Sequence, residues 1–144
     1  MNENDTIKLL RECDSGVKMG VAAINDVLPE VKSEELRDCL LNCRNQHEVL
    51  QKDIKNKLSA LGDNGKSPAP IVKGMAHVKT SVKLTVENSD NTVADLMTNG
   101  CNMGVKSLHR YLNLYSNADA DSRGIARRLI DVEDNLAKDM RRYL

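Results

Sequence analysis

The chain has 144 residues, and its 21 Lys and Arg residues balance 21 Asp and Glu residues, so that the formal net charge is zero. A chain of this length can bury a sizeable core without disulfides or metals, and residues 1–144 are expected to form a single domain. Balanced charge leaves no basic face for nucleic acid, and an aromatic content of 2% argues against base-stacking platforms.

The composition predicts a soluble cytoplasmic protein that does not bind membranes. Its first residues, Met1–Asp5, are polar and lead into no apolar signal core, and no apolar run reaches membrane-spanning length. The four cysteines have no familiar framework spacing and are expected to be reduced thiols: Cys13, Cys39, Cys43 and Cys101.

Hydrophobic periodicity predicts a first pair of helices over residues 5–28 and 33–61. Asp5 is expected to cap the first helix, and Pro29 to lie at or just beyond its end. Ser33 is expected to cap the second helix. Because the connection between them is only a few residues long, the two helices are expected to be antiparallel neighbours.

The stretch from Gly62 to Pro70 is the clearest break in the chain. A shorter helix is expected over residues 68–87; its β-branched content keeps a strand as an alternative, but its apolar spacing is helical. Two further long helices are expected over residues 91–116 and 121–143. The predicted fold is all-α, a four-helix bundle of two antiparallel hairpins with the short helix in the crossover, in preference to a simple up-down-up-down bundle.

Two stretches of the chain echo one another, Gly16–Ile24 and Gly100–Leu108, and each has glycines one helical turn apart. Glycine costs about 1 kcal/mol relative to alanine in a helix interior. We therefore expect these glycines to lie where two helices approach closely, so that two related hairpins pack face to face.

The order of elements runs helix, helix, Gly-rich break, short helix, helix, helix over nearly the full length. Small motifs accompany it: Cys13-Asp14-Ser15-Gly16, Asn99-Gly100-Cys101-Asn102 and Val132-Glu133-Asp134. In these features the chain resembles a bacterial ferritin-like family of unknown function. The resemblance implies a four-helix bundle, a bacterial cytosol and no established activity.

Ferritin-like bundles with a di-iron centre take a Glu from each of two helices and a Glu-x-x-His from each of the other two. The matching places here are Arg44-Asn-Gln-His47 and Glu133-Asp-Asn-Leu136, so that each half keeps one ligand type and lacks the other. Arg44 would also repel a dication. The iron chemistry is expected to be lost, and the candidate ligands of a degenerate iron or zinc site are His47, Glu133, Asp14 and Cys43.

Cysteine and histidine recur on one face of the second expected helix, at Cys39, Cys43 and His47. This spacing could supply part of a tetrahedral zinc site that Cys13 or Cys101 completes. A thiol switch that joins Cys13 to Cys101 is another alternative. The simpler explanation is that Cys43 is a small core residue and His47 a core histidine with one hydrogen-bond partner.

The sequence therefore favours a non-catalytic bundle without a cofactor. We expect it to act through self-association or through a helical partner protein. The alternative is a metal-binding or redox protein with a degenerate ferritin-type site in the bundle core.

Overall fold

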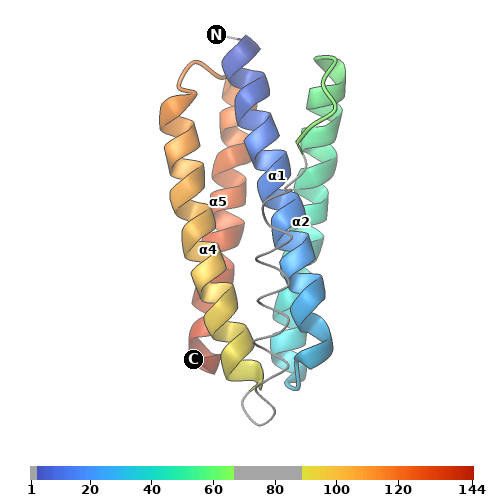
Figure 1. Ribbon diagram of the computed structural model, residues 1–144, viewed down its shortest axis with the longest axis vertical. Helices are drawn as coiled ribbons and strands as arrows, with labels where there is room; N and C mark the ends of the chain where they lie inside the picture. The colour runs from blue at the N-terminus through green and yellow to red at the C-terminus, as the bar shows by residue number, and fades with distance from the viewer. Residues whose placement is uncertain (1–2, 67–88) are drawn as a thin grey trace.

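The computed structural model describes residues 3–66 and 89–144, and this part of the chain is all-helical (Figure 1). The expected short helix over residues 68–87 lies outside the described residues. The long helices are α1 (Glu3–Val27), α2 (Glu34–Ala60), α4 (Ser89–Leu114) and α5 (Ala120–Met140), and the 3-10 turns are η1 (Leu28–Glu30) and η2 (Arg141–Tyr143). None of these helices is long and apolar enough to cross a membrane.

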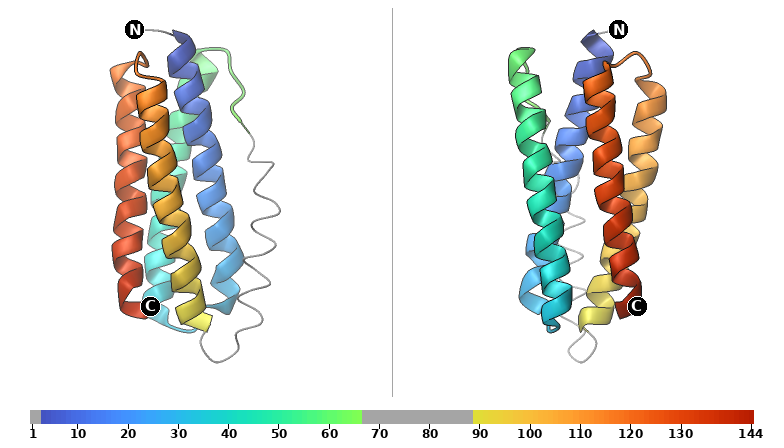
Figure 2. Two further views of the ribbon diagram at one scale, coloured as in Figure 1. Left: turned by 60° about the vertical axis from the view of Figure 1, so that its left-hand side comes forward. Right: turned by 180° about the vertical axis from the view of Figure 1, so that it is seen from behind.

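The helices lie along one axis as two antiparallel hairpins (Figures 1 and 2). α1 packs closely on α2, and α4 on α5, while contacts between α2 and α5 join the two hairpins. α2 ends and α4 begins at opposite ends of the bundle, so that these two helices run in the same direction. The parallel directions of α2 and α4 distinguish the fold from an up-down-up-down bundle.

Capping side chains set two of the helix starts. The Ser33 hydroxyl accepts a hydrogen bond from the Leu36 amide at 3.3 Å at the start of α2, as expected. The Asp119 carboxylate accepts one from the Ser122 amide at 2.7 Å at the start of α5. Each acceptor satisfies a backbone amide that has no partner within its own helix.

The expectation that Asp5 caps the first helix is wrong, because α1 already includes Glu3. The Asp5 carboxylate instead accepts a hydrogen bond from the Asn117 amide at 3.1 Å. The Asp5 carboxylate therefore stabilises the turn between α4 and α5 rather than the start of α1, its own helix. At the other end of the bundle, Asp90 accepts hydrogen bonds from the Lys32 and Ser33 amides at 2.7 and 2.9 Å.

Two hydrophobic clusters fill the two halves of the bundle. One is built around residues such as Leu10, Ile54 and Leu129, and the other around residues such as Ile24, Leu40 and Met140. Along α2 and α5, the boundary between them falls where His47 and Glu133 stand. The bundle therefore carries a polar pair between two apolar layers.

Candidate functional site

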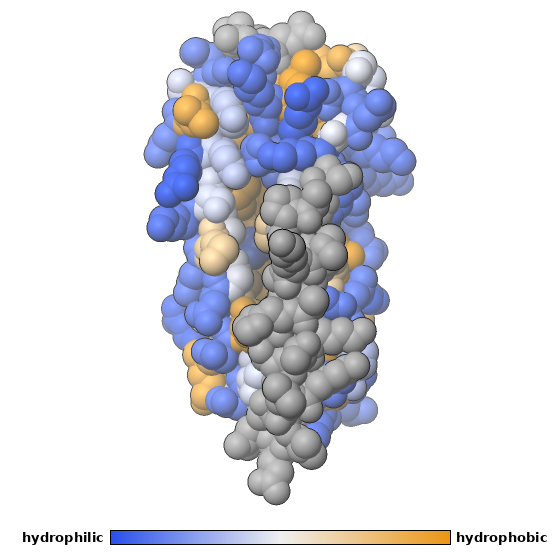
Figure 3. Space-filling model, in the orientation of Figure 1, coloured by the Kyte–Doolittle hydropathy of each residue, from blue (hydrophilic) through white to orange (hydrophobic). Residues whose placement is uncertain are grey.

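A groove of about 460 Å³ lies between α1 and α4. These two helices are neighbours, but they pack less closely than the two helices of either hairpin. Figure 3 faces this side of the molecule and shows recessed apolar surface beside the grey atoms. The groove therefore exposes apolar side chains between these two helices of the described bundle.

The two echoed sequences form the facing walls of this groove. Gly16 and Gly20 line it from α1, and Gly100 and Gly104 line it from α4. The methionines that hold equivalent places in the two motifs also line it and remain exposed: Met19 at 37% and Met103 at 68%. The internal repeat thus corresponds to the two sides of one groove.

Gly20 and Gly104 make room for side chains from α2 and α5. A Cβ atom added at Gly20 would lie 2.6 Å from Nε2 of His47. One added at Gly104 would lie 3.4 Å from Oε2 of Glu133. Each glycine therefore accommodates a polar side chain at the groove floor.

The expected close approach of glycine-bearing backbones is wrong. A Cβ atom at Gly16 would meet only the Leu129 side chain, at 3.8 Å, and one at Gly100 would meet no described atom within 4 Å. The missing side chains leave space between α1 and α4 instead of closing it. Their physical effect is to open the groove and to expose its floor.

His47 of α2 and Glu133 of α5 meet at that floor. Nε2 of His47 lies 3.0 Å from Oε1 of Glu133, and Nδ1 lies 2.8 Å from the backbone oxygen of Cys43. The His47 side chain is 1% exposed and the Glu133 side chain 12%. Because both ring nitrogens face an acceptor, a doubly protonated imidazole satisfies both hydrogen bonds with an ionised Glu133.

The surroundings of His47 favour its charged form. Burial lowers the pKa of the imidazole, but hydrogen bonds with Cys43 and Glu133 and the negative charge of Glu133 outweigh it and raise the pKa to about 10. At neutral pH the floor of the groove therefore holds an imidazolium–carboxylate pair.

The buried thiols of Cys43 and Cys101 lie beside the pair. Sγ of Cys43 lies 3.5 Å from Nδ1 of His47. Burial, the charge of Glu133 and a hydrogen bond with it all raise the pKa of the Cys101 thiol, and burial raises that of Cys13 to about 12. All four cysteines of the chain are free. Because Cys13 and Cys101 are held in the neutral form, these two thiols are poor nucleophiles and poor redox centres.

We expect iodoacetamide to alkylate Cys39 first in the native protein at pH 8. Cys39 is partly exposed, whereas Cys13, Cys43 and Cys101 are buried. Burial and nearby acidic side chains also raise the pKa of Cys39, so that its labelling is slow. Peptide mass spectrometry after timed quenching measures the order, with urea-unfolded protein as the control. Early labelling of Cys101 would contradict the buried, neutral thiol.

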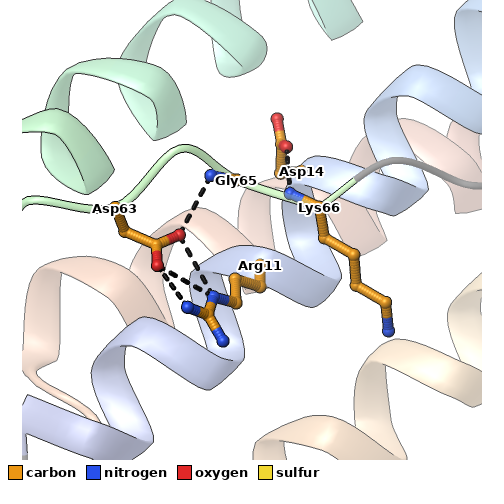
Figure 4. Close-up of polar contacts among 5 residues, drawn as sticks. All are labelled: Arg11, Asp14, Asp63, Gly65 and Lys66. Carbon is orange, nitrogen blue, oxygen red and sulfur yellow. Dashed lines mark hydrogen bonds and ion pairs between the residues drawn. The ribbon is translucent and has the colours of Figure 1, made fainter.

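Asp14, a candidate metal ligand, takes part in a different set of contacts (Figure 4). Its Oδ2 atom accepts hydrogen bonds from Nζ of Lys18 at 2.8 Å and from the Lys66 amide at 3.0 Å. Gly65 has a φ of +85°, and any Cβ there would collide with Asp14. Asp14 also precedes Gly20 by six residues, about 9 Å along the helix axis. Its structural role is to hold the loop after α2.

Arg11 and Asp63 complete this loop anchor, which the sequence analysis missed. Nε of Arg11 donates to both carboxylate oxygens of Asp63, at 3.0 and 3.1 Å, and Asp63 also accepts from the Gly65 amide at 2.9 Å (Figure 4). Nζ of Lys66 lies 2.5 Å from Oε1 of Glu12, a residue that lines the groove. The Asp-Asn-Gly sequence is a turn signal, but it does not identify the partner on α1.

The structure brings His47, Glu133 and Cys43 together and places Asp14 elsewhere. Within residues 3–66 and 89–144, no three His, Cys, Asp or Glu side chains are grouped so as to hold a metal ion. Arg44 donates to Oδ1 of Asn25 at 2.7 Å, between α2 and α1. Because both nitrogens of His47 are engaged with protein acceptors, a metal would have to displace Glu133 or the Cys43 carbonyl.

No protein-family model matches this chain, and no curated protein matches it either. One solved structure is similar, the crystal structure of a DUF305 fragment from Deinococcus radiodurans. It has a TM-score of 0.73 and 14% sequence identity, and the alignment covers 94% of this chain and 92% of that chain. The similarity shows a shared fold and agrees with the expectation of a helical protein of unknown function.

Proposed function

We propose that this protein is a non-catalytic helical bundle that binds an apolar ligand in the groove between α1 and α4. The groove itself carries the proposal. Its volume of about 460 Å³ falls within the range of small-molecule sites, and small and apolar residues line most of it. Met19 and Met103 support the proposal, because flexible thioether side chains adapt to apolar partners of varied shape.

The chemistry of the groove floor supports binding rather than catalysis. A general base needs a free lone pair, but both ring nitrogens of His47 make hydrogen bonds to the protein. A cysteine nucleophile needs a thiolate, but burial and Glu133 keep Cys101 neutral. The described lining thus lacks an activated nucleophile paired with a base.

Filling the groove tests the proposal. We expect the neutral fluorescent probe N-phenyl-1-naphthylamine to bind wild-type protein saturably, and Gly100→Leu to weaken that binding by about tenfold or more. Leucine at Gly100 projects into space where no described atom lies within 4 Å of its Cβ. Fluorescence titration measures the affinity. Wild-type protein that fails to bind the probe would overturn the proposal.

Gly124→Leu is the matched control. Gly124 lies on α5 outside the groove, and a Cβ there also meets no described atom within 4 Å. Its substitution is expected to leave the affinity for the probe unchanged. Equal loss of binding in the two variants would show that the probe is not in the groove.

We also propose that the bundle is of the ferritin-like type and that the protein self-associates. A ferritin-like bundle is supported by the two antiparallel hairpins and by the parallel directions of α2 and α4. Self-association is tested by light scattering across the micromolar range, and the metal-binding alternative by elemental analysis of wild-type and His47→Ala protein. A bacterial cytoplasmic location stays a prediction.

A further inference from the structure

We propose that the ligand is a small apolar molecule with one protonated amine, and that Glu133 receives the amine at the floor of the groove. This inference rests on the proposed function, because it names the class of ligand that the same groove takes. Three observations support it: the charges that line the groove, the exposure of the two members of the buried pair, and the position of Gly104.

Among the described residues that line the groove, the charged side chains are Glu12, His47 and Glu133. Each of the two carboxylates is paired with a described cation, Glu12 with Lys66 and Glu133 with the His47 imidazolium. The ionised Glu133 carboxylate only accepts hydrogen bonds, so that an ammonium head group, which donates them, suits it better than an anionic head group, which cannot. Lys66, the partner of Glu12, is 47% exposed, whereas His47, the partner of Glu133, is buried in the lining.

Exposure identifies Glu133 as the member of the pair that a ligand reaches. Glu133 keeps 12% of its side chain exposed, whereas His47 keeps 1%. Oε1 of Glu133 receives the imidazole N–H, and Oε2 lies toward α4, 3.4 Å from the position of a Cβ at Gly104. A carboxylate oxygen still has lone pairs for a further donor after one hydrogen bond. The absence of a side chain at Gly104 leaves an approach to Oε2 from the groove.

The length of the apolar wall indicates the shape of the ligand beyond its amine. Leu108 and Tyr111 line the groove toward one end, and Leu96 and Leu136 toward the other, with Glu133 between them. An unbranched alkyl chain fits an elongated apolar wall of this kind, while its ammonium group makes a charge-assisted hydrogen bond to Glu133.

Competition among decyl compounds tests this ligand class. Decylamine, decanol and decanoate share one apolar chain and differ only in the head group. We expect decylamine to displace N-phenyl-1-naphthylamine from wild-type protein at pH 7 with an affinity about tenfold above that of decanoate, and decanol to fall between them. All three are used below their micelle-forming concentrations. Equal displacement by decylamine and decanoate would overturn the ligand class while leaving the proposed function standing.

The variant Glu133→Gln tests whether Glu133 is the residue that causes the preference for the amine head group. The ratio of decylamine to decanoate affinity is expected to fall below about threefold in this variant. Glu48→Gln is the control, because Glu48 is an exposed acid on α2 that does not line the groove. If Glu133→Gln does not fold, Gly104→Ala replaces it, and the added methyl group should weaken decylamine more than decanol. A ratio that survives these changes would overturn the role of Glu133, and wild-type protein that binds no probe would overturn both proposals.

Discussion

Alanine at Gly20 is expected to lower the free energy of unfolding by about 2–4 kcal/mol, although alanine is the better helix former. The added Cβ would lie 2.6 Å from Nε2 and 2.8 Å from Cδ2 of His47. The imidazole cannot rotate away cheaply, because its hydrogen bonds to Glu133 and to the Cys43 carbonyl hold both nitrogens. The substitution therefore displaces His47 and breaks a buried ion pair, an effect larger than the gain of about 1 kcal/mol in helix propensity.

The other glycines of the repeat provide the comparison. Gly16→Ala and Gly100→Ala are expected to raise the free energy of unfolding by up to about 1 kcal/mol, since neither added Cβ would crowd a described atom. Urea unfolding followed by circular dichroism at 222 nm measures all three variants. Destabilisation of Gly20→Ala no greater than that of Gly100→Ala would show that the glycine at position 20 does not accommodate His47.

Local sequence patterns were sufficient to predict much of the fold. Apolar residues that recur every three to four positions indicate which segments are helical. Ser33 accepts a hydrogen bond from an amide of its own helix, so that its capping role can be predicted from a few neighbouring residues. Asp5 was misread because its partner, Asn117, lies 112 positions away. A carboxylate near a helix start accepts hydrogen bonds equally well from its own helix and from a distant turn.

The candidate site was predictable only in part. His47 and Glu133 stand out as remnants of a ligand pattern, but their contact joins residues 86 positions apart and depends on which faces of α2 and α5 meet. The glycine repeat was seen and its role misjudged. Glycine permits a close backbone approach or leaves room for a side chain, and sequence alone does not distinguish the two. Asp14 lies on the face of α1 that holds the loop, which only the packed structure reveals.

Because His47 and Glu133 form a buried ion pair, we expect a substitution of His47 to lower the free energy of unfolding strongly. His47→Ala is expected to lower the free energy of unfolding by about 3–5 kcal/mol at pH 6, because it leaves a mostly buried carboxylate without its partner. His109→Ala is the matched control, since His109 is exposed on α4, and it should change stability by less than about 0.5 kcal/mol. Similar effects of the two substitutions would contradict a structural ion pair.

The stabilising effect of His47 should disappear in alkaline solution. The pKa of His47 is raised in the folded chain to about 10, above the value of about 6.5 for a histidine in the unfolded chain. Its contribution is therefore fully present below pH 6.5 and is lost as the pH rises through 10. A double-mutant cycle of His47→Ala and Glu133→Gln isolates the pair from the cysteines and tyrosines that also titrate at high pH. The coupling free energy should be a few kcal/mol at pH 6 and close to zero at pH 10.5. A coupling free energy that does not change with pH would mean that a neutral hydrogen bond, rather than a pair of charges, joins the two hairpins.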